Sequence, residues 1–130
     1  MIDLAHIVLP GGPARVAPFS HAVRAGDFLF VTGQMPTLPG DNTRCVKGDV
    51  AAQTRQVIAN LKAVLAGSGA SWSRTAMARI YLTDFGRDYA AMNTVWEAAF
   101  TPGLLPARTT VGVTGLALGA LVEIDLVVAL

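Results

Sequence analysis

The stretch LVEIDLVVAL, residues 121–130, has the pattern of a β-strand with two largely apolar faces. Side chains alternate between the two faces of a strand. One face would carry only branched aliphatic residues, namely Val122, Ile124, Leu126 and Val128. The other face is apolar apart from Glu123 and Asp125, whereas a sheet covered on one side only shows a polar second face. We therefore expect helices on the first face and another copy of this chain on the second.

Three further regions of the chain have strand character. The turn residues Ala25, Gly26 and Asp27 separate two short β-prone runs, which predicts a hairpin whose second arm begins at Phe28. The segment 75–83 alternates with a period of two, and PARTTVGV, residues 106–113, supplies a strand over 107–113. The segment TGLALGA links that strand to the last one, at 121–129.

Two helices are predicted from apolar residues at spacings of three and four. The first would begin after Asp49 as N-cap and stop at Gly67. The second carries a core-type stripe from Tyr89 to Phe100 and is closed by Pro102 and Gly103. The element order ββ, α, β, α, ββ predicts an α+β fold in a single domain, residues 1–130, with both helices on one face of the sheet.

Composition narrows the function classes. Of 130 residues, 52% are hydrophobic and 15% charged, and the mean hydropathy is +0.48, so a partner subunit is expected to hide apolar surface. The net charge is +1 with basic residues scattered singly, which argues against nucleic-acid binding. The most apolar stretch contains Glu123 and Asp125, and the N-terminus lacks a signal-peptide pattern, so we expect no membrane span and a cytoplasmic location.

No metal or organic cofactor is expected from the residue pattern. Cys45 is the only cysteine, which leaves no thiol cluster for zinc. His6 and His21 lack Asp, Glu or Cys neighbours at metal-ligand spacing, and we expect both to be surface or interface residues. Gly11 and Gly12 indicate a turn.

Arg108 is the candidate for chemistry, because it stands inside the strand 107–113 on the same face as Thr110. A guanidinium cannot lose its proton, and its planar fork of donors matches a carboxylate. Leaving such a charge unpaired at a buried site is costly, so it needs an anion. The anion could be Glu123 or Asp125 on a neighbouring strand, as a structural ion pair, or the carboxylate of a substrate. Residue types alone leave both possibilities open.

Several motifs, in order and over nearly the whole chain, resemble the RidA (YjgF) family of reactive-intermediate deaminases. The matching segments are APFSHAV (17–23), AGDFLFVTGQMP (25–36), GDVAAQTRQVIANLKAVLAGSGAS (48–71), YLTDF (81–85), MNTVWEAAF (92–100), PARTTV (106–111) and GALVEID (119–125). The resemblance implies a chorismate-mutase-like subunit in a homotrimer with clefts between subunits. It also implies cofactor-free hydrolysis of 2-imino or enamine acids, of the 2-iminobutanoate and 2-iminopropanoate type, to 2-oxo acids and ammonia.

The resemblance also implies roles for individual residues. Arg108 matches the arginine that grips the substrate carboxylate, and Glu123 matches the acid that positions the attacking water. The backbone at Gly33 and the hydroxyl of Thr32 would face the ligand. The remaining expected ligand contacts are the main chain of Thr110, where many members have cysteine, and the side chain of Asn93.

One departure from the family pattern concerns a tyrosine, which is replaced here by Phe19, so that a hydroxyl that would reach the ligand is missing. The mechanism implied by the resemblance needs an ionised Glu123, which a nearby Arg108 would favour. Three alternatives remain open at this stage: a 2-aminomuconate-type deaminase, a trimeric carboxylate-binding module without turnover, and a holdase or translation-directed protein.

Overall fold

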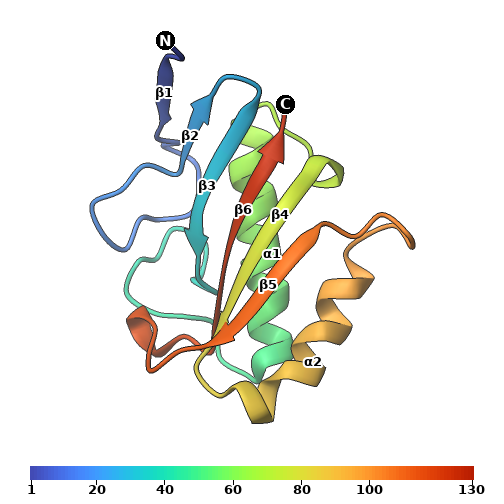
Figure 1. Ribbon diagram of the computed structural model, residues 1–130. Helices are drawn as coiled ribbons and strands as arrows, with labels where there is room; N and C mark the ends of the chain where they lie inside the picture. The colour runs from blue at the N-terminus through green and yellow to red at the C-terminus, as the bar shows by residue number, and fades with distance from the viewer.

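The computed structural model describes all 130 residues, which form a six-stranded sheet with two helices packed on one of its faces (Figure 1). The strands lie in the order β1-β2-β3-β6-β4-β5, and all neighbours are antiparallel except β4 and β5. The elements are β1 (Leu4–Ile7), β2 (Ala22–Ala25), β3 (Phe28–Gln34), α1 (Val50–Gly67), β4 (Thr75–Leu82), α2 (Phe85–Ala98), β5 (Ala107–Gly112) and β6 (Val122–Ala129), with short 3₁₀ turns at Trp72–Arg74 and Ala117–Gly119.

Strand β6 lies in the middle of the sheet, between β3 and β4. Its aliphatic face is buried beneath the helices, where Val122, Ile124 and Val128 have no exposed surface and Leu126 is 2% exposed. Strands β3 and β4, together with α1 and α2, supply the rest of this core. The expected α+β fold with both helices on one face is therefore confirmed.

The opposite face of the sheet, which we call the open face, is not covered by any element of the chain (Figure 1). Phe28 and Phe30 on β3 are 47% and 49% exposed there. Both rings lie beside Val127 and Ala129 of β6, which they meet in the strand register. The covering of this face by a second copy stays a prediction, and its apolar character supports it.

The expected hairpin is confirmed, with Gly26 in the left-handed conformation (φ +58°) between β2 and β3. Strand β3 continues to Gln34, and its register with β6 shifts between Val31 and Gln34. The edge strand β1 was not predicted from the sequence, because four residues without a clear apolar alternation give no strand signal.

Both helices begin after a carboxylate cap, and the cap of α1, Asp49, was predicted. The Asp49 side chain accepts from the Ala52 amide at 3.0 Å, as expected, but α1 includes Gly67 and ends at the cap residue Ser68. Gly67 was expected to stop the helix, but the structure gives another reason for glycine at this position. A Cβ there would lie 2.7 Å from Leu9 Cδ1, so there is no room for a side chain. The left-handed residue that follows is Gly69, with φ +70°.

Helix α2 begins at Phe85, directly after its N-cap residue Asp84, and ends at Ala98, before Pro102. Its start lies four residues before Tyr89, the first residue of the apolar stripe from which the helix was predicted. Met92 and Trp96 are buried as expected. Trp72 also packs, with its indole N–H donating to the Ala99 carbonyl at 2.8 Å. None of the helices is both long and apolar enough to cross a membrane.

Candidate functional site

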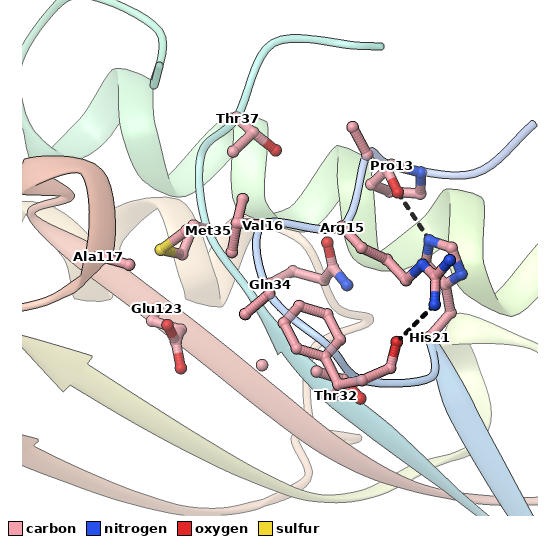
Figure 2. A pocket seen from close by; sticks show the side chains of 14 residues that line it. Pro13, Arg15, Val16, His21, Thr32, Gln34, Met35, Thr37, Ala117 and Glu123 are labelled. Atoms are coloured by element: carbon pink, nitrogen blue, oxygen red, sulfur yellow. Dashed lines mark hydrogen bonds between the residues drawn. The ribbon is translucent and has the colours of Figure 1, made fainter. Parts of the chain in front are cut away.

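A cavity of about 270 Å³ lies where β3 ends and β6 begins, beside the N-terminal loop (Figure 2). Four of the residues expected to contact a ligand line it, namely Phe19, Thr32, Gly33 and Glu123. We call these four residues the glutamate half-site. The structure thus brings residues from the first and last thirds of the chain together at one place, whereas Asn93, Arg108 and Thr110 do not line this cavity.

An irregularity in β3 brings the strand close to Glu123. The register shift spans Thr32 and Gly33, and the Thr32 side chain there donates to the Ser20 carbonyl at 2.6 Å. Gly33 lies so close to β6 that a Cβ on it would be 2.5 Å from Glu123 Oε2. Glycine is thus required at this position by the carboxylate beside it.

The Glu123 carboxyl group is half-buried and has no hydrogen-bond donor within the chain. Burial, and secondarily the negative charge of Asp125, raises its pKa above the ordinary glutamate value. Asp125 is itself held by Arg79 at 2.9 Å and by the Tyr81 hydroxyl at 3.1 Å. Within a single chain, burial and Asp125 are the causes of the shift and Arg108 is not among them, so an effect of Arg108 on the ionised form of Glu123 requires a second copy and stays a prediction.

Arg108 lies on β5 and is held by uncharged groups of α2. Its Nη1 donates to Asn93 Oδ1 at 2.7 Å, and its Nη2 lies 3.3 Å from the Tyr89 hydroxyl. Its guanidinium carbon is 5.8 Å from the centre of the Tyr89 ring. The structural ion pair considered above is therefore not formed, since neither Glu123 nor Asp125 reaches Arg108. We call Tyr89, Asn93, Arg108 and Thr110 the arginine half-site.

Strand order explains why the ion pair is absent. Strands β5 and β6 are not neighbours, because β4 lies between them. Arg108 is opposite Ala78 of β4, whereas Glu123 is opposite Tyr81. Positions 78 and 81 differ by an odd number, so their side chains point to opposite faces of the sheet. Arg108 thus lies on the helix-covered face and Glu123 on the open face, and the predicted site residues form two separate groups within one chain.

Two members of the arginine half-site need comment. The Thr110 hydroxyl is buried and has no hydrogen-bond partner, on the same strand face as Arg108. Tyr89 was assigned to the core from its helical spacing, but it is 36% exposed, stacks on Phe85 and contacts Arg108. Tyr89 precedes Asn93 by four residues, so both lie on one side of the helix. This spacing was the signal that could have identified Tyr89 as a neighbour of Arg108.

The expectation for His21 is wrong, because this residue is 2% exposed. Its ring accepts from the Leu9 amide at 3.0 Å and lies 2.6 Å from the Pro13 carbonyl (Figure 2). It therefore holds the N-terminal loop over the cavity. Cys45 is partly buried, which raises its thiol pKa. No three His, Cys, Asp or Glu side chains gather as the ligands of a metal ion would.

The chain is similar to known proteins over most of its length. The family model described as endoribonuclease L-PSP matches residues 11–130. Protein DfrA of Myxococcus xanthus is 46% identical over 115 residues, which cover 87% of this chain and 86% of that protein. A RutC family protein of Pyrococcus horikoshii is 40% identical over 119 residues, or 92% of each chain.

Two solved structures have the same fold over their whole length. RidA from an Antarctic Psychrobacter superposes with a TM-score of 0.87 at 30% identity, covering 97% of this chain and 99% of that one. The YjgF gene product of E. coli gives a TM-score of 0.84 at 28% identity, with 96% and 98% covered. From the family match, the close relatives and the shared fold, we conclude that this chain belongs to the RidA (YjgF) family.

Proposed function

We propose that the protein hydrolyses 2-imino acids and their enamine tautomers to 2-oxo acids and ammonia. The observation that carries this proposal is that the Arg108 guanidinium and the Glu123 carboxyl both lack a charged partner within the chain. A half-buried cation held by neutral groups is suited to a carboxylate from outside. A half-buried carboxyl without donors is suited to a water molecule or a proton.

A complete site requires two copies of the chain, because the two half-sites lie on opposite faces of the sheet. We propose that the arginine half-site of one copy meets the glutamate half-site of the next. Such an interface joins two different surfaces, and it closes into a ring when the rotation between copies permits. The apolar open face supports this assembly, and the family resemblance gives the number of copies as three.

The proposed reaction needs no redox step. Arg108 binds the carboxylate and orients the electrophilic carbon C2 towards a water molecule held by Glu123. The water oxygen attacks C2, the π electrons of the C=N bond move to nitrogen, and Glu123 accepts the proton lost by water. Glu123 returns that proton to the nitrogen, which gives a carbinolamine with a hydroxyl group and an amino group on C2. The carboxylate then takes the hydroxyl proton and passes it to the nitrogen, the C–N bond breaks, and ammonia leaves as the C=O bond forms. A carboxyl whose pKa is raised by burial is well suited to accept and return a proton.

One alternative has a specific observation in its favour. The arginine half-site holds its guanidinium in place without Glu123, so a trimer that binds carboxylates without turnover would need only that half. The exposed Phe28 and Phe30 would serve a holdase only if no copy of the chain covers them. Within the enzyme class, a larger enamine such as 2-aminomuconate is a possible substrate. We place the reaction in the cytoplasm, where pyridoxal-phosphate dehydratases would supply imines.

The proposal is tested by producing 2-iminobutanoate in situ with a dehydratase and trapping the surviving imine with semicarbazide. Added protein is expected to suppress the trapped product in proportion to its concentration. If trapping is unchanged while 2-oxobutanoate still binds, the binding-module alternative is correct. Single-stranded RNA should be tested in parallel, because the family description names an endoribonuclease.

Substitution of Gly33 by alanine is expected to lower kcat/KM for 2-iminobutanoate by about tenfold or more, because the new methyl group displaces the Glu123 carboxylate. The matched control is Gly86→Ala on α2, where an added Cβ meets no atom within 4 Å. Steady-state kinetics of both variants check the prediction. Equal kcat/KM values for Gly33→Ala and wild type would show that catalysis does not depend on the position of the Glu123 carboxylate.

The pH profile of kcat/KM is expected to fall on the acid side as Glu123 becomes protonated and can no longer accept a proton from water. Burial raises the pKa of this group, whereas Arg108 of the next copy would lower it, so the position of the fall reports the balance of the two effects. Loss of a neighbouring cation raises a carboxyl pKa further, so the residual activity of Arg108→Gln should fall at still higher pH. An unshifted acid limb in that variant would place Arg108 away from Glu123 in the assembly.

A further inference from the structure

We propose that the preferred substrate carries a second carboxylate at the end of its side chain, as in the imino acid derived from glutamate. This inference rests on the proposed function and specifies the substrate class of the same site. It comes from the part of the cavity that lies beyond Glu123, which the hydrolysis itself does not use. Two polar groups lie there, Gln34 and Arg15 (Figure 2).

The cavity extends well past the reacting centre. Its volume of about 270 Å³ in a single chain is close to the lower end of the roughly 300–1,000 Å³ of small-molecule pockets. Part of its wall is apolar, with Phe19, Val16 and Met35 contributing. A substrate whose C2 lies at Glu123 would therefore pass its methylene groups along this wall.

Gln34 is the buried polar group further inside. It is 6% exposed, and no hydrogen bond within the chain uses its side-chain amide. In Figure 2 the side chain lies between Glu123 and Arg15, with its amide end on the side of Arg15. The buried side-chain atoms that lack a partner are Ser68 Oγ and Thr110 Oγ1, so the Gln34 amide is not one of them and still reaches the cavity. It can therefore form hydrogen bonds with a polar group that enters the cavity.

Arg15 supplies a positive charge at the same end. The four ion pairs of the chain involve Arg44, Arg79 and Arg87, but not Arg15. One of its nitrogens donates to the Phe19 carbonyl at 3.1 Å, which fixes the side chain across the loop and leaves the other donors free. Arg15 does not lower the raised pKa of Glu123. The charge that affects this pKa, besides the effect of burial, is that of Asp125.

The two ends of the cavity therefore differ in chemistry. One end has a carboxyl group able to handle water, and the other has an amide donor and a guanidinium without an acid. Arg15 is exposed, so water can solvate it in the empty cavity. A guanidinium and an amide together match a carboxylate, whereas an aliphatic end group would bind neither of them. The arrangement favours 2-iminoglutarate over an imino acid of similar length with an apolar side chain.

The test compares 2-iminoglutarate, made from L-glutamate by an amino-acid oxidase, with the imino acid made in the same way from norleucine. Wild type is expected to have the higher kcat/KM for 2-iminoglutarate. In Arg15→Ala and in Gln34→Leu the ratio of the two values should fall, by about tenfold or more for the arginine. Arg44→Ala is the matched control, because it removes an exposed arginine from a nearby loop, and its ratio should equal that of wild type.

Equilibrium binding of 2-oxoglutarate and 2-oxobutanoate, followed by calorimetry, gives a second readout that does not depend on turnover. Arg15→Ala should weaken binding of 2-oxoglutarate selectively. The inference would be overturned if the ratio of the two kcat/KM values were near one in wild type, or if Arg15→Ala left it unchanged. Activity on 2-iminobutanoate would leave the proposed function intact in that case. Inactivity on all of these imines would overturn both.

Discussion

Replacing Arg108 by alanine is expected to lower kcat/KM for 2-iminobutanoate by about 10- to 150-fold, which corresponds to the loss of a charge-assisted hydrogen bond worth about 1.5–3 kcal/mol. The guanidinium is already oriented by Asn93 and Tyr89, so little ordering is needed when the carboxylate binds. Binding of 2-oxobutanoate should weaken in the same variant. Steady-state kinetics and calorimetry measure the two effects.

Two controls separate carboxylate binding from folding. Arg108→Lys keeps the charge but loses the planar fork, so its activity should lie between those of wild type and Arg108→Ala. Arg74→Ala removes an exposed arginine that makes no ion pair, and it should behave as wild type. An Arg108→Ala protein with wild-type kinetics would exclude Arg108 from substrate binding.

Replacing Glu123 by glutamine is expected to lower kcat by about 10²- to 10⁴-fold, the usual contribution of a group that accepts and returns a proton. Glutamine has nearly the same shape, so the close approach of Gly33 is preserved. Binding of 2-oxobutanoate should change little, because Arg108 remains. Single-turnover kinetics on 2-iminobutanoate would show the loss directly.

Stability gives the control for this variant. Burial raises the pKa of Glu123 in the folded chain, so the fold favours the protonated form and loses stability as the pH rises through that pKa. Glutamine removes this penalty at neutral pH, unless Arg108 of another copy offsets it. Thermal unfolding of Glu123→Gln should therefore occur at a temperature close to or above that of wild type. Full activity in a stable Glu123→Gln protein would assign Glu123 a structural part.

The local parts of the fold could be predicted from the sequence. Alternation along 121–129 identified the buried face of β6, and Asp49 identified the start of α1, because both signals arise from neighbouring residues. Arg108 and Glu123 were also identified from the sequence, because a charged side chain inside a largely apolar strand is costly unless it has a partner. Their candidate roles came from the family resemblance, which the fold and the relatives support.

The pairing of strands could not be predicted in the same way. Strand β6 follows β5 in sequence but inserts between β3 and β4. An ion pair between Arg108 and Glu123 in one chain, which was one of the two possibilities left open by the residue types, is therefore not formed. Strand order depends on contacts between distant segments, which local periodicity does not report. Burial of His21 and Gln34 was missed for the same reason, because the loop that covers them packs from elsewhere in the chain.

The most direct test is to mix the two impaired variants, Arg108→Ala and Glu123→Gln, within one assembly by co-expressing them in equal amounts. If each site takes Arg108 from one copy and Glu123 from the next, random mixing restores both residues in about a quarter of the sites, and activity should recover to about a quarter of wild type. A mixed assembly no more active than either variant alone would contradict a site built from two copies.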